Sequence, residues 1–183
     1  MKKYYIYFVV IVLVVVGVFI YNKNSTSNTG VGYKNATYRV DGKIVNLVSG
    51  LSQEPVVPGS ASKITTRYFG NSVEHDFDKD GRNDIAFLLT QQSGGSGTFY
   101  YVVVALNKPD GYVGTDATII GDRITPQTTE VNDRGFIVVN YVDRKPGESF
   151  AVQPSLGKSL WFKFDPATGQ LGVVVQNFEG ESR

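Results

Sequence analysis

From Thr37 onward, short runs rich in β-branched and aromatic residues alternate with glycine, proline, asparagine and aspartate turn signals. Asp41-Gly42 separates the runs TYRV and KIVNLV, and this dipeptide between two such runs predicts a tight β-hairpin. Later runs of strand length are IAFLLT, TFYYVVVAL, FIVVNYV, SLWFKF and LGVVVQ. No convincing amphipathic helix is available to connect parallel strands. The pattern therefore predicts an all-β domain of about 8–10 short strands, folded as an antiparallel sandwich or an open barrel.

Side chains alternate between the two faces of a strand, so each predicted strand has an inner set and an outer set. Hydrophobic residues make up 42% of the chain, which suffices for a core of ordinary size. A shift of one residue would exchange the two faces of any strand. We expect the inner faces to carry Ile85, Phe87, Leu89, Val102, Val104, Ile119, Ile137, Val139, Trp161 and Val174.

The eighteen residues from Tyr4 to Tyr21 contain no charged side chain, and Lys2 and Lys3 precede them. A helix of this length spans roughly 27 Å, close to the thickness of the hydrocarbon core of a bilayer. A basic flank stays on the cytoplasmic side of a membrane. Residues 1–21 are therefore predicted to form a single-pass signal-anchor helix in the cell membrane, with the rest of the chain extracytoplasmic.

Two other interpretations of this apolar run stay open. It could be a cleaved signal peptide, for which Ser25 and Ser27 offer a late small-x-small site, or it could be a buried core segment. The anchor is favoured because the run exceeds a signal-peptide core and bulky polar residues follow it. Residues 22–36, rich in Asn, Ser, Thr and Gly, are expected to form a flexible linker before an extracytoplasmic β domain at residues 37–183.

The most specific motif is DFDKDGRND, which places aspartates at positions 1, 3, 5 and 9 and a glycine at position 6. Alternate residues of a tight loop can direct their carboxylates towards one centre, and the glycine allows a sharp reversal. Calcium binds about six to eight oxygens at about 2.3–2.6 Å, and the carbonyl of position 7 can supply one. The predicted Ca²⁺ ligands are Asp76, Asp78, Asp80, the carbonyl of Arg82, and Asp84.

The motif differs from an EF-hand, because position 12 is Phe87 instead of a bidentate glutamate and a strand is predicted to follow instead of a helix. Asp-x-Asp-x-Asp-Gly-x-x-Asp before an apolar strand resembles the calcium loop of FG-GAP/VCBS-type repeats. Phe69-Gly70, just upstream, is similar to their Phe-Gly start. The resemblance implies that the four aspartates ligate calcium and brace a hairpin.

The segments GGSGTFYYVVVAL, IGDRITPQTTE and VNYVDRKPGE resemble those of exported, membrane-anchored bacterial domains. That resemblance implies a location at a bacterial cell surface and carries no particular activity. Members of that group that are anchored through a lipid would need a cysteine, which this chain lacks.

The aspartate cluster could also be a turn that binds no metal, since Asp and Gly are common turn residues. Calcium is favoured because four carboxylates at this spacing repel one another strongly without a cation, whereas a bound metal turns them into a folding constraint. Magnesium is disfavoured because it dehydrates reluctantly and needs octahedral geometry. We expect the calcium to brace the fold and not to take part in a reaction.

Composition excludes several classes of function. The chain has no cysteine, which excludes disulfides, thiolate metal sites and cysteine nucleophiles. Any histidine-based triad would have to use His75, the only histidine. The net charge of +1 argues against a nucleic-acid partner. The loop SGGSG at residues 93–97 lacks the lysine and the following helix of a phosphate-binding loop.

The expected function is non-enzymatic: a binding or structural role at the cell surface, with a cell-envelope protein or glycan as the partner. A carbohydrate-binding module is the alternative, and a hydrolase with paired carboxylates is a third candidate. Aromatic residues that could stack on sugars are Tyr100, Tyr101, Tyr112 and Trp161. Acidic residues that could form a catalytic pair are Glu130, Asp133 and Glu148.

Overall fold

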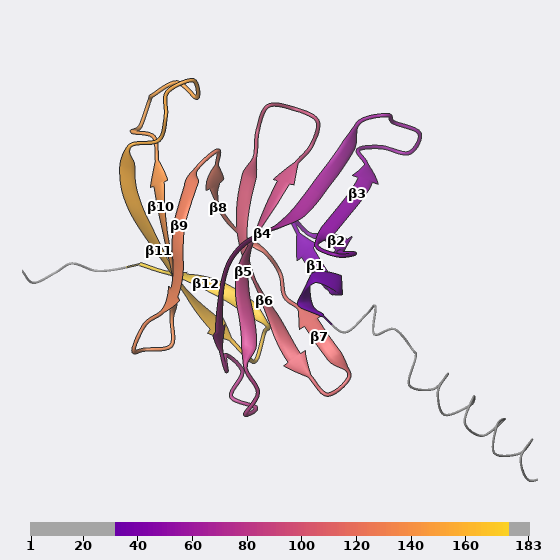
Figure 1. Cartoon of the computed structure of the whole chain (residues 1–183), viewed down its shortest axis with the longest axis vertical. Coiled ribbons are helices and arrows are strands. Elements are labelled where there is room, and N and C mark those ends of the chain that lie inside the picture. The colour runs from indigo at the N-terminus through magenta and orange to yellow at the C-terminus, as the bar shows by residue number, and fades with distance from the viewer. Residues whose placement is uncertain (1–31, 176–183) are drawn as a thin grey trace, which may run out of the picture.

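The computed structural model describes residues 32–175, which form one short 3-10 helix and twelve β-strands (Figure 1). The elements are η1 Tyr33–Asn35, β1 Thr37–Val40, β2 Lys43–Asn46, β3 Leu51–Pro55, β4 Lys63–His75, β5 Asp84–Gln92, β6 Phe99–Lys108, β7 Gly111–Gly114, β8 Thr118–Asp122, β9 Thr125–Val131, β10 Ile137–Asp143, β11 Leu156–Asp165 and β12 Gln170–Val174. The all-β prediction is confirmed. The strands outnumber the expected set because β3 and β9 are largely polar edge strands with no apolar run to mark them.

The predicted anchor helix at residues 1–21 lies outside the described residues. Among residues 32–175, no helix is long and apolar enough to cross a membrane.

The strands form three sheets. A hairpin joins β1 and β2, a central sheet has the order β3-β4-β5-β6-β7 with β8 also paired to β6, and a third sheet has the order β12-β11-β10-β9. Every strand ladder is antiparallel. In Figure 1 the β9–β12 sheet lies on one side of the central sheet and the β1–β2 hairpin on the other. The predicted antiparallel architecture is therefore present as a layered, sandwich-like fold.

The first core lies between the central sheet and the β9–β12 sheet. Ala86, Leu88, Val102 and Val104 face it from β5 and β6 and are fully buried. Residues of the β9–β12 sheet pack against them and are buried to a similar degree, namely Ile137, Val139, Phe162, Phe164 and Leu171. This is the ordinary interior of a β-sandwich, in which alternate residues of each strand point inward.

The second core lies on the opposite face of the same two strands. Phe87, Leu89 and Val103 point away from the first core and are also fully buried. The β1–β2 hairpin covers them with Tyr38 and Val40, each 1% exposed. Strands β5 and β6 are thus buried on both faces, which explains why IAFLLT and TFYYVVVAL are continuous apolar runs instead of alternating ones.

The predicted inner face is wrong for three strands. On β12 the buried residue is Leu171, and the predicted Val174, on the opposite face, is only partly covered. Ile119 of β8 is 52% exposed and its neighbour Ile120 is buried, while in β11 the buried residue is Phe162 and Trp161 is only partly covered. Because strand side chains alternate, a register error of one residue exchanges the two faces. On β8 the pairing with β6 also shifts at a bulge, and no local pattern predicts that shift.

Residues 32–36, at the end of the predicted linker, belong to the fold in the described structure. The Tyr33 ring packs against the rings of Tyr68, Phe87 and Tyr112 at centroid distances of 5.8, 5.4 and 5.8 Å. Ala36 is buried in the second core. The folded domain therefore begins before Thr37, because one tyrosine in a polar stretch closes the end of this core.

The hairpin approaches β7 so closely that one glycine is required there. A Cβ added to Gly114 would lie 2.3 Å from the Thr37 carbonyl oxygen and 2.4 Å from the Tyr38 ring. Hydrogen bonds join Arg39 N to the Thr115 carbonyl and Ala117 N to the Arg39 carbonyl, so the backbones meet at this point. Glycine is the residue that permits such an approach.

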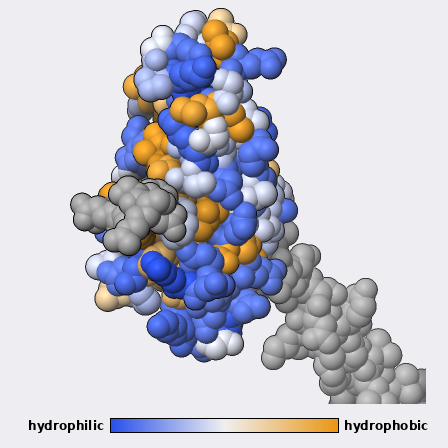
Figure 2. All heavy atoms as spheres, turned by 90° about the vertical axis from the view of Figure 1, so that its left-hand side faces the viewer, coloured by the Kyte–Doolittle hydropathy of each residue, from blue (hydrophilic) through white to orange (hydrophobic). Residues whose placement is uncertain are grey.

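The outer face of the β9–β12 sheet meets solvent. Figure 2 shows this side of the molecule, where hydrophobic residues form small patches among hydrophilic ones. The alternation along β11 agrees, with Phe162 and Phe164 buried and Lys163 and Asp165 exposed. The third sheet therefore contributes one face to the core, as antiparallel sheets commonly do.

Candidate metal centre

The aspartate motif forms the loop that joins β4 to β5. His75 at the end of β4 pairs with Asp84 at the start of β5, so the two core strands hold both ends of the loop together. Lys79 and Gly81 have φ values of 62° and 88°, in the left-handed region. The glycine at position 6 thus permits the reversal for which the sequence predicted it.

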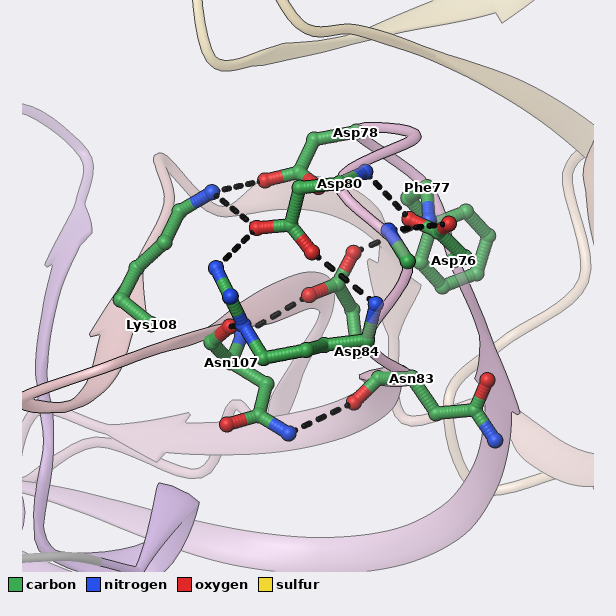
Figure 3. Close-up of polar contacts among 10 residues, drawn as sticks. Asp76, Phe77, Asp78, Asp80, Asn83, Asp84, Asn107 and Lys108 are labelled. Atoms are coloured by element: carbon green, nitrogen blue, oxygen red, sulfur yellow. Dashed lines mark hydrogen bonds and ion pairs between the residues drawn. The ribbon is translucent and has the colours of Figure 1, made fainter.

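Asp84 is the buried anchor of the loop, with no exposed surface. Its Oδ2 accepts a hydrogen bond from the backbone N–H of Phe77 at 2.9 Å, and its Oδ1 accepts one from the N–H of Asn107 at 2.8 Å. One carboxylate therefore ties the start of the loop to the end of β6 (Figure 3). Burial raises the pKa of Asp84, an effect that the two N–H donors oppose.

The side chains of Asp76 and Asp78 accept hydrogen bonds from backbone N–H groups of their own loop. Asp76 Oδ1 and Oδ2 accept hydrogen bonds from the N–H groups of Asp80 and Gly81 at 3.0 and 2.9 Å. Asp78 Oδ1 accepts a second, longer bond from the Asp80 N–H at 3.2 Å. These contacts are the Asx-turn arrangement that favours aspartate in tight loops, and they orient both carboxylates towards the loop interior (Figure 3).

Three of the predicted ligands come together. One carboxylate oxygen from each of Asp76, Asp78 and Asp84 lies within 4.8 Å of the other two. Two oxygens that each lie about 2.5 Å from a shared calcium ion can be at most about 5 Å apart. The spacing and the all-oxygen chemistry of this aspartate triad therefore fit a hard divalent cation.

Asp80 makes different contacts. Its Oδ2 accepts a hydrogen bond from Lys108 Nζ at 2.9 Å and also pairs with the guanidinium of Arg82. The same Lys108 ammonium pairs with Asp78 (Figure 3). The hydrogen bond from Lys108 lowers the pKa of Asp80, and the two carboxylates raise the pKa of Lys108.

Sequence reasoning missed Lys108. It lies at the end of β6, 28 residues beyond Asp80, and nothing in the motif indicates it. Only the β5–β6 pairing brings it to the loop, where its ammonium supplies positive charge beside the aspartates. Arg82 also contributes its side chain, because its Nε donates to the Asn107 carbonyl oxygen at 2.6 Å. The Arg82 carbonyl stays a predicted ligand.

The other candidate residues are dispersed. Tyr101 is buried and donates its hydroxyl to Asp41 at 2.8 Å, so it belongs to the core and not to a sugar platform. Asp133 lies in the β9–β10 turn, whereas Glu148 lies in the β10–β11 loop at the opposite end of β10. The topology therefore separates these two members of the proposed acid pair.

Comparisons with known proteins add no relative. No family model, no curated protein and no solved structure matches this chain.

Proposed function

We propose that this chain is a calcium-braced β domain with a non-enzymatic binding or structural role, held at the outer face of the cell membrane by its N-terminal segment. The observation that carries the proposal is the convergence of Asp76, Asp78 and Asp84 at the loop between two core strands. The similarity of the motif to the FG-GAP/VCBS-type loop supports the same metal. The membrane location rests on the uncharged run from Tyr4 to Tyr21.

Calcium would brace this fold by neutralising the aspartates where they crowd together. Asp84 is buried and already tied to β6, so a cation shared with Asp76 and Asp78 would link the exposed part of the loop to the core. An ion that binds only the folded state stabilises that state against unfolding, by about 2.7 kcal/mol at a free calcium concentration 100 times the dissociation constant. Extracellular calcium modules bind with constants of about 10⁻⁴–10⁻³ M, which suits a domain outside the cell.

A melting experiment on the full chain in a non-ionic detergent tests the calcium brace. Wild type is expected to melt roughly 5–11 °C higher in saturating calcium than in EDTA, from the stabilisation above and the usual sensitivity of domains of this size. Magnesium should give a smaller shift. Asp78→Asn keeps the shape and one acceptor of the side chain but removes a charged ligand, so its calcium shift should be largely lost.

Asp133→Asn is the matched control, because it removes an exposed aspartate from another turn. It should keep the wild-type calcium shift. Equal melting of wild type in calcium and EDTA would refute the brace, and a normal shift in Asp78→Asn would refute the ligand assignment.

The location has its own test. A reporter that is active only outside the cytoplasm, fused after Arg183, should be active in cells that express the full chain. An inactive reporter, together with activity of a cytoplasmic reporter at the same site, would overturn the proposed orientation.

A further inference from the structure

A cavity of about 660 Å³ opens beside the β4–β5 loop. This loop lies at the lower end of the molecule in Figure 1. The β4–β5 loop, the β9–β10 turn, the end of β11 and strand β12 surround it. It thus lies between loops and strand ends of the central sheet and of the β9–β12 sheet, and segments far apart in the sequence form its walls. Its volume is within the range of small-ligand sites, about 300–1,000 Å³.

Aromatic and aliphatic side chains line the inner part of this cavity. Phe77 and Phe164 meet there with ring centroids 6.5 Å apart, and both belong to the first core. Phe136 and Val173 continue the apolar lining. Phe77 and Phe164 are each only 6% exposed, so they form the floor of the cavity. The apolar surface open to a ligand comes from Phe136, which is partly buried, and from Val173, which is 52% exposed.

Three cations from three different segments stand around the same cavity: Lys79 of the metal loop, Arg134 of the β9–β10 turn and Lys163 of β11. All three are exposed. None forms an ion pair within 4 Å with a carboxylate of residues 32–175. Their charges are therefore available to a ligand.

The two acidic residues of the cavity wall already have hydrogen-bond donors. Asp76 accepts two N–H groups of its own loop. Asp165 accepts the N–H of Ala167 at 3.0 Å and the hydroxyl of Thr168 at 2.9 Å, and these two bonds lower its pKa. The charge of Lys163 adds to this lowering, although the two groups form no ion pair within 4 Å. The two carboxylates of the wall thus have hydrogen-bond donors, and the three cations outnumber them by one.

We propose that this cavity binds an anionic glycan, meaning a chain of sugar or polyol units that carries carboxylates or phosphates. Lys79, Arg134 and Lys163 would pair with the acidic groups, and the guanidinium suits carboxylate and phosphate alike. Phe136 and Val173 would contact the apolar faces of the repeating units. The inference rests on the proposed function in taking the ligand from the cell envelope, and it requires no metal at the aspartate triad.

Titration calorimetry on the full chain in non-ionic detergent, with EDTA and low salt, tests the proposal. The probes are hexagalacturonate for the carboxylate form, a glycerol phosphate hexamer for the phosphate form, and maltohexaose as the neutral control. The test variant is the double substitution Arg134→Gln and Lys163→Gln. The matched control is Lys63→Gln with Arg67→Gln, which removes the same charge from exposed positions at the far end of β4 from His75.

Wild type is expected to bind at least one anionic probe about tenfold or more tightly than maltohexaose, and the tighter probe identifies the acidic group. The test variant should weaken that binding about tenfold or more, and the control about twofold or less. No preference for either anionic probe would overturn the proposal, and so would equal losses in the two double variants. Because EDTA removes calcium, this result is independent of the calcium melting shift.

Discussion

Asp84→Asn is the substitution that most directly tests how the loop is held. In the structure each carboxylate oxygen of this buried residue accepts one backbone N–H, from Phe77 and from Asn107. Asparagine keeps the volume but has one acceptor and one donor group. Whichever way the amide turns, one backbone N–H loses its partner and faces an NH₂ group.

The expected loss of stability is about 2 kcal/mol in the absence of calcium. Leaving a buried donor unsatisfied costs about 1–3 kcal/mol, and a bond to a charged acceptor contributes about 1.5–3 kcal/mol. An opposing gain comes from removing a charge that burial disfavours, the same cause that raises the pKa of Asp84. For a chain of this size, a loss of about 2 kcal/mol lowers Tm by roughly 4–8 °C.

Urea unfolding of the full chain in EDTA measures this loss, because the chelator removes any contribution of Asp84 as a metal ligand. The fluorescence of Trp161, the single tryptophan, and the far-ultraviolet circular dichroism should report the same transition. Asp165→Asn is the control. Asp165 also accepts an N–H in a turn, but it is exposed, so water can replace the lost bond and the change should stay within about 0.5 kcal/mol.

The reasoning fails if Asp84→Asn in EDTA is as stable as wild type within about 0.5 kcal/mol. Such a result would mean that the two buried hydrogen bonds do not hold the loop. An equal loss in Asp165→Asn would show that burial is not the cause.

Three further predictions concern packing, charge and pH. Gly114→Ala should lose about 1–3 kcal/mol in urea unfolding because the new methyl group overlaps the hairpin, while Gly172→Ala, whose methyl would have its nearest neighbour at 3.9 Å, should be close to wild type. Lys108→Met should bind calcium several-fold more tightly by calorimetry and be less stable in EDTA, because the ammonium that pairs with the loop aspartates opposes a second cation. Partial burial raises the pKa of Asp143, but the hydrogen bond from Lys158 opposes it and holds this pKa below its usual value. The ion pair therefore stabilises the folded state above the unfolded pKa of about 3.9. At neutral pH the free energy of unfolding of wild type should exceed that of Lys158→Met by at most about 1 kcal/mol, and this difference should disappear as the pH falls through the lower folded pKa of Asp143.

The candidate metal loop was predictable because its information is local. The spacing of Asp76, Asp78 and Asp84 over nine residues specifies which carboxylates can converge, and Gly81 supplies the reversal they need. The position of Asp80 was not predictable. Its carboxylate turns to Lys108, a residue that only the pairing of β5 with β6 brings into contact.

The cavity beside the β4–β5 loop depends on long-range contacts even more than the position of Asp80 does. Lys79, Arg134 and Lys163 are separated by 55 and 29 residues in the sequence, and each belongs to an ordinary polar stretch. No spacing rule connects them. They share one cavity because the packing of the two sheets brings the β4–β5 loop, the β9–β10 turn and the end of β11 together.

The all-β class, the antiparallel pairing, the Asp41-Gly42 hairpin and the convergence of three loop aspartates were predictable from the sequence alone, because period-two patterning, turn residues and ligand spacing act over a few neighbouring residues. The tertiary structure decided that β5 and β6 are buried on both faces, that Ile120 and Phe162 point inward, and that Lys108 sits beside the aspartates. Those outcomes depend on which sheet covers which face. That choice is made by long-range packing of apolar surface, which no local pattern encodes.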